Sequence, residues 1–126
     1  MTQSAVIVTG AASGIGYACA HDLLTDGVPV VATDIGETPA ALVNAGDCLP
    51  LSFDVFAEQS CQDAVASATA RFGGVRALIH FAGIQHTKTW DEVTGEDFAH
   101  VYAVNVTGSF LMARVVAGQM QDSGGS

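Results

Sequence analysis

Short apolar runs alternate with longer segments of helical spacing along the whole chain. The runs are rich in valine, isoleucine and leucine, which is typical of strands that are buried on both faces. We therefore expect strands at residues 5–8, 28–33, 48–53 and 76–82. The segments between them place apolar residues three or four positions apart, as a helix packed on a sheet does. We expect helices at residues 17–26, 38–45, 60–72 and 96–121.

Polar residues and glycines mark the ends of the longer predicted helices. Ser60 with Asp63, and Thr94 with Asp97, have the spacing of a capping pair at a helix start. Gly73 follows the third helical segment and is expected to end it.

The last predicted helix is expected to bury one broad apolar face. Its members are Phe98, Val101, Tyr102, Val106, Phe110, Ala113, Val116, Ala117 and Met120. Asn105 and Ser109 fall on the same face by helical spacing, so a polar side chain interrupts it.

Alternating strands and helices predict an α/β fold with a parallel sheet and right-handed crossovers. The expected arrangement is a Rossmann-like, doubly wound sheet with strand order 3-2-1-4, and residues 1–126 are expected to form one domain. A binding crevice is expected at the carboxyl ends of strands one and four, where the winding reverses.

Composition narrows the class of protein and its partners. Apolar residues make up 49% of the chain and charged residues 13%, which argues against disorder. The net charge of −9, with only four lysines and arginines, argues against nucleic acid or an anionic membrane surface as a partner. We expect a cytoplasmic, soluble protein, because no apolar run approaches the length of a membrane span. The cysteines and histidines lack the spacing of a metal site, so no metal is expected.

A glycine-rich turn follows the first predicted strand. Residues 9–16 read T-G-A-A-S-G-I-G and lead into the first predicted helix. Glycines at such a corner let the chain turn sharply, let backbone N–H groups approach an anion, and let the helix pack closely on the sheet. The unpaired N–H groups at the helix start suit a pyrophosphate. An ordinary structural turn remains the alternative.

Asp34 stands at the end of the second predicted strand, where a carboxylate can accept hydrogen bonds from both hydroxyls of an adenosine ribose. It would repel a 2′-phosphate, and no Arg or Lys lies in the glycine turn to offset that repulsion. A charged hydrogen bond contributes about 1.5 to 3 kcal/mol, enough for a preference of about tenfold or more. The sequence therefore favours NAD over NADP. The alternative is a solvated turn residue.

The motif T-G-x-x-x-G-x-G after a first strand resembles the cofactor motif of the short-chain dehydrogenase/reductase family. The resemblance covers essentially the whole chain, as the N-terminal, cofactor-binding half of that family. It implies that a nicotinamide cofactor is bound by Gly10, Ser13, Gly14, Ile15, Gly16, Asp34, Ile35, Asp54, Val55, Phe81, Ala82 and Gly83.

The resemblance also implies individual roles. Asp54 would accept from the adenine amino group and the Val55 N–H would meet the ring, unless Asp54 only begins a helix. Asn105 would be catalytic, binding a water in the proton relay and perturbing the helix; the alternative is a local backbone hydrogen bond.

One short motif departs from the family pattern. Members of the family have Asn-Asn-Ala-Gly at the positions where this chain has His80-Phe81-Ala82-Gly83. Ala82 and Gly83 fit, and Phe81 can still serve through its backbone. His80 is expected to be a core histidine whose ring hydrogen bond replaces the bracing of the family's asparagine.

The family's catalytic Ser and Y-x-x-x-K set is missing. Neither tyrosine has a lysine four residues later: His21 follows Tyr17 and Val106 follows Tyr102. Residues 123–126 look like the turn into the family's fifth strand, so the catalytic set is expected beyond them. The intact protein is expected to interconvert a secondary alcohol and a ketone with NAD(H), and this chain alone is expected to be inactive.

Two alternatives to a half enzyme stay open. One is a non-catalytic nucleotide-binding or assembly module, and the other is an inert fragment. An unprotected edge of the fourth strand and apolar surface on the last helix predict association, either with another copy or with a complementing C-terminal half.

Overall fold

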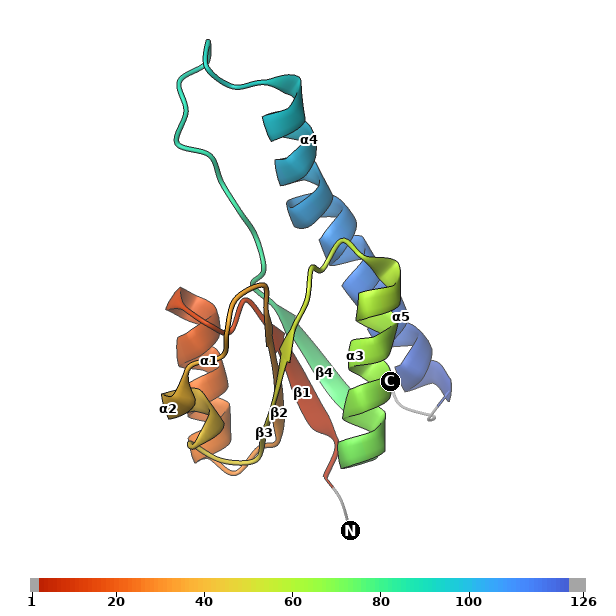
Figure 1. The fold of residues 1–126 in the computed structure, drawn as a ribbon. Coiled ribbons are helices and arrows are strands. Elements are labelled where there is room, and N and C mark those ends of the chain that lie inside the picture. Colours follow the sequence, from red (N-terminus) through yellow and green to blue (C-terminus); the bar gives the residue numbers. More distant parts are fainter. Residues whose placement is uncertain (1–2, 123–126) are drawn as a thin grey trace.

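The computed structural model describes residues 3–122, in which strands and helices alternate as the apolar pattern predicts (Figure 1). The strands are β1 (Ala5–Thr9), β2 (Val30–Asp34), β3 (Cys48–Ser52) and β4 (Val75–His80). The helical elements are α1 (Gly14–Thr25), α2 (Ala40–Val43), α3 (Glu58–Phe72), α4 (Gly95–Tyr102), a π-helical segment η1 (Ala103–Thr107) and α5 (Gly108–Asp122). The expected turn at residues 123–126 lies outside the described residues.

The four strands form one parallel sheet in the order β3-β2-β1-β4, so the predicted α/β, Rossmann-like fold and its strand order are confirmed. In the register, Thr9 stands between Thr33 of β2 and His80 of β4. The carboxyl ends of all four strands therefore lie along one edge of the sheet, which is the edge where the crevice was predicted.

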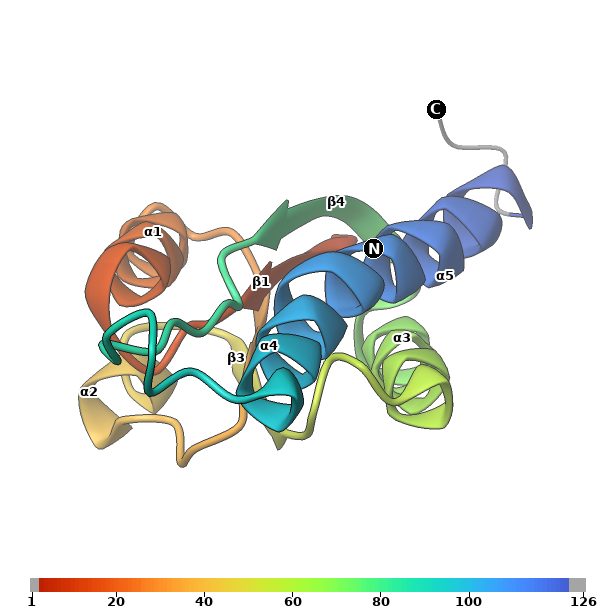
Figure 2. The ribbon, with the colours of Figure 1, turned by 90° about the horizontal axis from the view of Figure 1, so that it is seen from above.

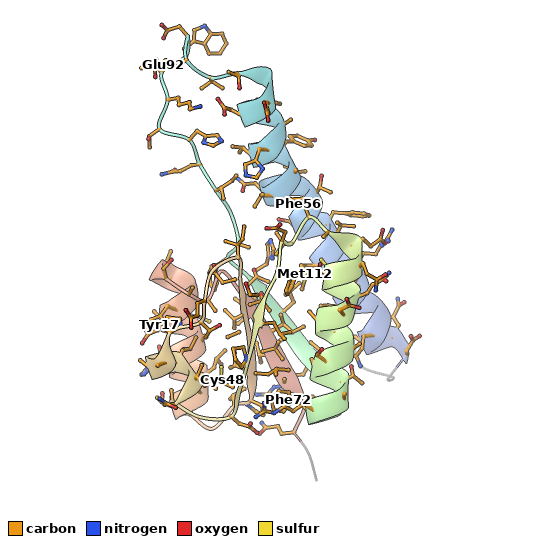
Figure 3. All side chains as sticks on the ribbon, in the orientation of Figure 1. Tyr17, Cys48, Phe56, Phe72, Glu92 and Met112 are labelled. Carbon is orange, nitrogen blue, oxygen red and sulfur yellow. The ribbon has the colours of Figure 1, made fainter. Side chains whose placement is uncertain are left out.

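Helices cover both faces of the sheet (Figure 2). Helices α1 and α2 cover one face, and their buried core includes Val8, Ala20, Leu24, Val30 and Leu42. Helices α3 and α5 cover the other face, with a core that includes Ile7, Val31, Phe72, Met112 and Val116. The labelled side chains of Phe72 and Met112 lie in this second layer (Figure 3).

Local backbone geometry decides where the helices begin and end. The capping box at Thr94 and Asp97 is confirmed, since each backbone N–H donates to the other side chain at 3.1 Å. Gly73 ends α3 as predicted, with a φ of 83°. The predicted cap at Ser60 and Asp63 is wrong.

Helix α3 begins before that predicted cap because the chain already turns after Asp54. The N–H of Ala57 donates to the Asp54 carbonyl at 3.1 Å, and Ala57 becomes the N-cap of a helix that starts at Glu58. Ser60 and Asp63 therefore lie inside the helix, where the Asp63 carboxylate accepts from Gln59 Nε2 at 2.9 Å.

The predicted buried face of the last helix is largely wrong. The residues of this helix that are buried are Val104, Gly108, Leu111, Met112 and Val116. Six members of the predicted face are exposed instead: Phe98, Tyr102, Val106, Phe110, Ala113 and Ala117. The helix carries two apolar stripes, and the sheet covers the one with Gly108, because only a residue without a side chain fits against Val55.

The last helix and its approach extend past the sheet. Helix α4 and the loop of residues 84–94 project beyond it, and no residue of α4 is buried (Figure 1). By length and composition alone, the helical stretch Gly95–Asp122 could cross a membrane; 22% of its most apolar part is buried inside the protein.

Two side chains of the last helix hold β4. Gln119 Oε1 accepts from the N–H of Val75, at the start of the strand, at 3.1 Å. Asn105 binds the backbone of Ile84, just after the strand's end.

Candidate functional site

A cavity of about 360 Å³ lies at the carboxyl ends of the strands. Every residue predicted to bind cofactor lines it except Gly14: Gly10, Ser13, Ile15, Gly16, Asp34, Ile35, Asp54, Val55, Phe81, Ala82 and Gly83. The structure therefore brings together positions that lie far apart in the sequence. Their cofactor roles stay predictions.

The glycine turn is shaped by backbone contacts that exclude side chains. A Cβ atom on Gly16 would lie 2.1 Å from the Gly10 carbonyl oxygen, so α1 packs directly on the turn. Gly10 and Gly14 have φ values of 67° and 61°, which favour glycine. Ser13 is the N-cap of α1 but its side chain makes no capping bond, and the first turn holds no acidic residue. The first N–H groups of α1 are thus suited to an anion.

Asp34 joins the glycine turn to the end of β2. Its Oδ2 accepts from the N–H of Ala12 and its Oδ1 from the N–H of Gly36, both at 3.0 Å. Each carboxylate oxygen still has a lone pair for another donor. The isoleucines Ile15 and Ile35 also line the cavity, although both are largely exposed. The carboxylate thus stands on the cavity wall between exposed apolar side chains.

Among the described residues, no lysine or arginine lines the cavity. Three of the four are committed to ion pairs elsewhere: Arg71 with Asp47, Lys88 with Asp97, and Arg114 with Glu58. The fourth, Arg76, lies at an exposed position of β4. An anion in this cavity would depend on backbone N–H groups for its neutralisation.

The part of the cavity next to β3 and the last helix combines apolar and aromatic side chains with the Asp54 carboxylate. Asp54 and Val55 follow β3 there, and Val104 comes from the π-helical segment. Phe56 and His100 make an edge-to-face contact with ring centroids 6.3 Å apart. Figure 3 shows Phe56 on the segment between β3 and α3, close to the last helix.

Thr9 holds the cavity wall that follows β4. Its hydroxyl accepts from the N–H groups of Phe81 and Ala82 at 3.0 and 3.1 Å, and it lies 2.8 Å from His80 Nδ1. The predicted ring hydrogen bond of His80 is therefore present. The half-buried ring has no resolved charge partner, and burial lowers the pKa of His80 below 6.5.

Asn105 lies beside the cavity, in the π-helical segment. Its Oδ1 accepts from the N–H of Ile84, its Nδ2 donates to the Ile84 carbonyl, and both distances are 2.8 Å. Its own carbonyl accepts from Ser109 Oγ at 2.7 Å. The predicted perturbation of the helix is present as the π turn. Each polar atom of the side-chain amide thus makes one hydrogen bond to Ile84, in the loop after β4, and the proton-relay role stays a prediction.

Sequence reasoning missed several cavity residues: Thr33, Phe53, Phe56, Ile84, His100 and Val104. Thr33 precedes Asp34, and its buried hydroxyl has no hydrogen-bond partner among the described residues. His100 and Val104 are one turn apart on a helix that meets the segment after β3 only in the folded chain, and only their helical spacing could have indicated them. Gln85 and His86, which follow Ile84 in the same loop, are exposed and do not line the cavity.

Comparisons with known proteins agree with this geometry. The family model described as short chain dehydrogenase matches residues 4–126. The chain is 36% identical to human 3-hydroxyacyl-CoA dehydrogenase type-2 over 124 residues, which cover 90% of the chain and 47% of that protein. It is 33% identical to D-threitol dehydrogenase of Mycolicibacterium smegmatis over 125 residues, covering 94% of the chain and 48% of that protein.

Solved structures give the same assignment. A 3-ketoacyl-ACP reductase from Sinorhizobium meliloti superposes with a TM-score of 0.86 at 30% identity, over 97% of this chain and 51% of the reductase. The chain thus spans about half the length of the relatives it matches. On its sequence match and its fold, the chain belongs to the short-chain dehydrogenase/reductase family.

Proposed function

We propose that residues 1–126 form a single domain that binds NAD and supplies the cofactor half of an oxidoreductase interconverting a secondary alcohol and a ketone. The observation that carries this proposal is the position of the Asp34 carboxylate on the cavity wall, bonded to Ala12 of the glycine turn, with no lysine or arginine lining the cavity.

The proposed pose runs along the sheet edge. The pyrophosphate would lie at the start of α1, where N–H groups without intrahelical partners meet the positive end of the helix dipole. The adenosine ribose would bind Asp34, and the adenine would lie between Asp54 and Val55. Phe81 to Gly83 would flank the nicotinamide end. Any hydride transfer would be supplied by the bound nicotinamide.

Selection for NAD over NADP follows from charge. The Asp34 carboxylate already accepts two backbone N–H bonds, from Ala12 and Gly36, which hold it in place on the cavity wall. A 2′-phosphate there would meet a negative group with no lysine or arginine on the cavity wall. Family members bind nicotinamide cofactors, and one relative, from Listeria innocua, is named an NAD-dependent glycerol dehydrogenase.

The substrate class is proposed from the relatives. Their names include dehydrogenases of D-threitol, glycerol and a 3-hydroxyacyl thioester, all of them hydroxy compounds. The described tyrosines are not placed for proton transfer here. Tyr17 stacks on His21 and Tyr102 on Phe98, and the lone lysine of the chain, Lys88, pairs with Asp97. A complementing C-terminal half would supply the acid/base set.

Association is proposed through two features. Strand β4 is at the edge of the described sheet, with β1 as its one strand neighbour. The last helix exposes a stripe of four residues, which we call the aromatic stripe: Phe98, Tyr102, Val106 and Phe110. Exposed apolar surface of this kind marks an interaction site. A second copy, or the complementing half, is the proposed partner in the cytoplasm, and the net charge of −9 disfavours nucleic acid and anionic membranes.

The contacts of Asn105 are also compatible with a second, non-catalytic function. Because both polar atoms of its amide bond to Ile84, its observed contacts hold the loop after β4 and do not by themselves indicate catalysis. In a non-catalytic nucleotide-binding or assembly module, Asn105 would need only to hold this loop. Turnover of an alcohol by the intact or complemented protein separates the two functions.

Calorimetric titration of the 126-residue chain with NAD and NADP tests the binding proposal. We expect NAD to bind more tightly by about tenfold or more, and Asp34→Ala to abolish that preference. Asp63→Ala is the matched control, because it removes an exposed carboxylate that does not line the cavity. A folded chain that binds neither dinucleotide, or binds both equally well, would overturn the proposal.

A further inference from the structure

The hydroxyl of Thr9 stands at the centre of three hydrogen bonds. The N–H groups of Phe81 and Ala82 both point at its oxygen, at 3.0 and 3.1 Å. A hydroxyl has two acceptor lone pairs and one proton. Both lone pairs are taken by the two N–H donors, so the hydroxyl proton must go to His80 Nδ1, at 2.8 Å.

This count fixes the state of the His80 ring. Nδ1 accepts a proton from Thr9 and is therefore unprotonated, which leaves the ring proton of neutral histidine on Nε2. Nε2 is buried and has no partner among the described residues. A buried donor without a partner costs free energy, which the hydrogen bond from Thr9 to Nδ1 partly offsets.

Protonation of His80 would break this arrangement. The imidazolium carries a proton on Nδ1 as well, which would then face a hydroxyl oxygen without a free lone pair. Thr9 could accept it only by releasing the N–H of Phe81 or of Ala82. Phe81 N–H also reaches the Thr9 carbonyl, at 3.3 Å, whereas Ala82 N–H has no second acceptor among the described residues.

The peptide held by Thr9 forms part of the cavity. Phe81 and Ala82 line it, and their peptide packs against the glycine turn so closely that a Cβ on Gly10 would lie 2.9 Å from the Phe81 carbonyl carbon. Any movement of this peptide therefore changes the space next to Gly10, where the cofactor is proposed to bind.

No ionisable group on the elements around His80 has a resolved effect on the pKa of its ring. Strand β1 has no ionisable side chain. The face is covered by α3 and α5, whose ionisable groups in the described chain are Cys61, Glu58, Asp63, Arg71, Arg114 and Asp122. Beyond them, α4 and η1 add Glu96, Asp97, His100 and Tyr102. Burial is the one resolved cause of the lowered pKa of His80, with no charge contribution from any of these groups.

We propose that His80 is a positioning residue that, through Thr9, holds the Phe81–Ala82 wall of the cavity only while its ring is neutral, so that proton uptake by His80 weakens cofactor binding. The proposal rests on the NAD binding proposed above. It assigns a function to the position at which the chain departs most clearly from the family's Asn-Asn-Ala-Gly pattern.

The test is the pH dependence of NAD affinity, measured by calorimetry on the 126-residue chain between pH 8 and pH 5. We expect the affinity to fall by up to about tenfold per pH unit once the pH drops below the pKa of His80 in the free chain. In His80→Asn, an amide oxygen can still accept the Thr9 proton and cannot titrate in this range, so the pH-dependent loss should disappear, whatever the affinity of this variant at pH 8.

Two histidine controls complete the design. His86→Asn alters an exposed ring outside the cavity, and His100→Asn alters a ring that lines it. Both variants should keep the pH-dependent loss, whatever their affinity at pH 8. A loss that disappears in His100→Asn instead of His80→Asn would overturn the proposal.

Nitrogen NMR of the unmodified chain tests the hydrogen bond itself, even if a variant fails to fold. At pH 8 we expect His80 to be protonated on Nε2 and bare on Nδ1; the opposite tautomer would overturn the inference. Tight NAD binding at pH 8 with the same pH profile in His80→Asn and wild type would overturn the inference alone. Absence of NAD binding at pH 8 would overturn the proposed function and the inference with it.

Discussion

Gly108 in the last helix lies so close to Val55 that a Cβ atom on the glycine would stand 2.6 Å from Val55 Cγ2. Val55 is 7% exposed and lines the cavity as well. The contact therefore ties the packing of the last helix to one wall of the proposed adenine site.

Gly108→Ala is expected to destabilise the protein. Overpacking of this kind costs about 1 to 3 kcal/mol, which exceeds the gain of about 1 kcal/mol from replacing a helical glycine by alanine. The displaced Val55 should also weaken NAD binding. Gly118→Ala is the matched control, because Gly118 lies in the same helix with nothing within 4 Å of its added Cβ. Urea unfolding should show Gly108→Ala less stable than wild type and Gly118→Ala at least as stable; the reverse order would contradict the packing argument.

Asn105→Ala is expected to loosen the loop that follows β4, because it removes both hydrogen bonds to Ile84. Each bond contributes about 0.5 to 1.5 kcal/mol, so the free energy of unfolding should fall by about 1 to 3 kcal/mol. Hydrogen exchange of the Ile84 backbone amide should be faster in this variant than in wild type, because the amide loses its acceptor. Ser109→Ala removes a neighbouring bond to the Asn105 carbonyl and should leave the Ile84 amide protected. Unchanged exchange in Asn105→Ala would show that the loop is held by other contacts.

The carboxyl of Asp97, at the start of α4, is expected to titrate at unusually low pH. The Lys88 ammonium donates to Asp97 Oδ2 at 2.8 Å, and with the N–H of Thr94 it lowers the pKa of Asp97 to about 2. Because this pKa lies below its unfolded value, the stabilisation is complete above about pH 4 and is lost as the pH falls toward 2. Carboxyl NMR should show the low midpoint in wild type and a higher one in Lys88→Met. Arg71→Met should not move it, since Arg71 pairs with Asp47.

Removing the aromatic stripe is expected to reduce association. Phe98 and Phe110 are 67% and 59% exposed, and replacing both by serine takes away most of the apolar surface that a partner would cover. Sedimentation velocity should show wild type associating at micromolar concentration and the double variant shifted toward monomer. Trp90→Ser is the control, because Trp90 is 96% exposed in the loop and lies outside the stripe. A monomeric wild type would count against association through this surface.

The strands and the cofactor edge could be predicted because their signals are local. Apolar runs such as Val30 to Thr33 are readable without tertiary information, and the carboxyl ends of parallel strands share one edge. That geometry alone placed Asp34 and Asp54 on the same cavity.

The errors arose where tertiary packing decides. Two apolar stripes on the last helix are equally regular in sequence, and the contact between Gly108 and Val55 selects the one that is buried. The start of α3 depends on a turn at Ala57 that has no side-chain cap. His100 reaches the cavity because the last helix packs against the segment after β3, through Phe56 and Val55, which no local pattern encodes.

The two amide side chains of the last helix that hold β4 have a consequence for the order of unfolding. Gln119 binds Val75, the first residue of β4, and Asn105 binds Ile84, which follows the end of the strand. The last helix therefore holds this edge strand near both of its ends. Fraying of this strand must first release the helix, and detachment of the helix frees both ends of the strand. The edge strand and the last helix therefore form one cooperative folding unit, although the projecting loop of residues 84–94 separates them in the sequence.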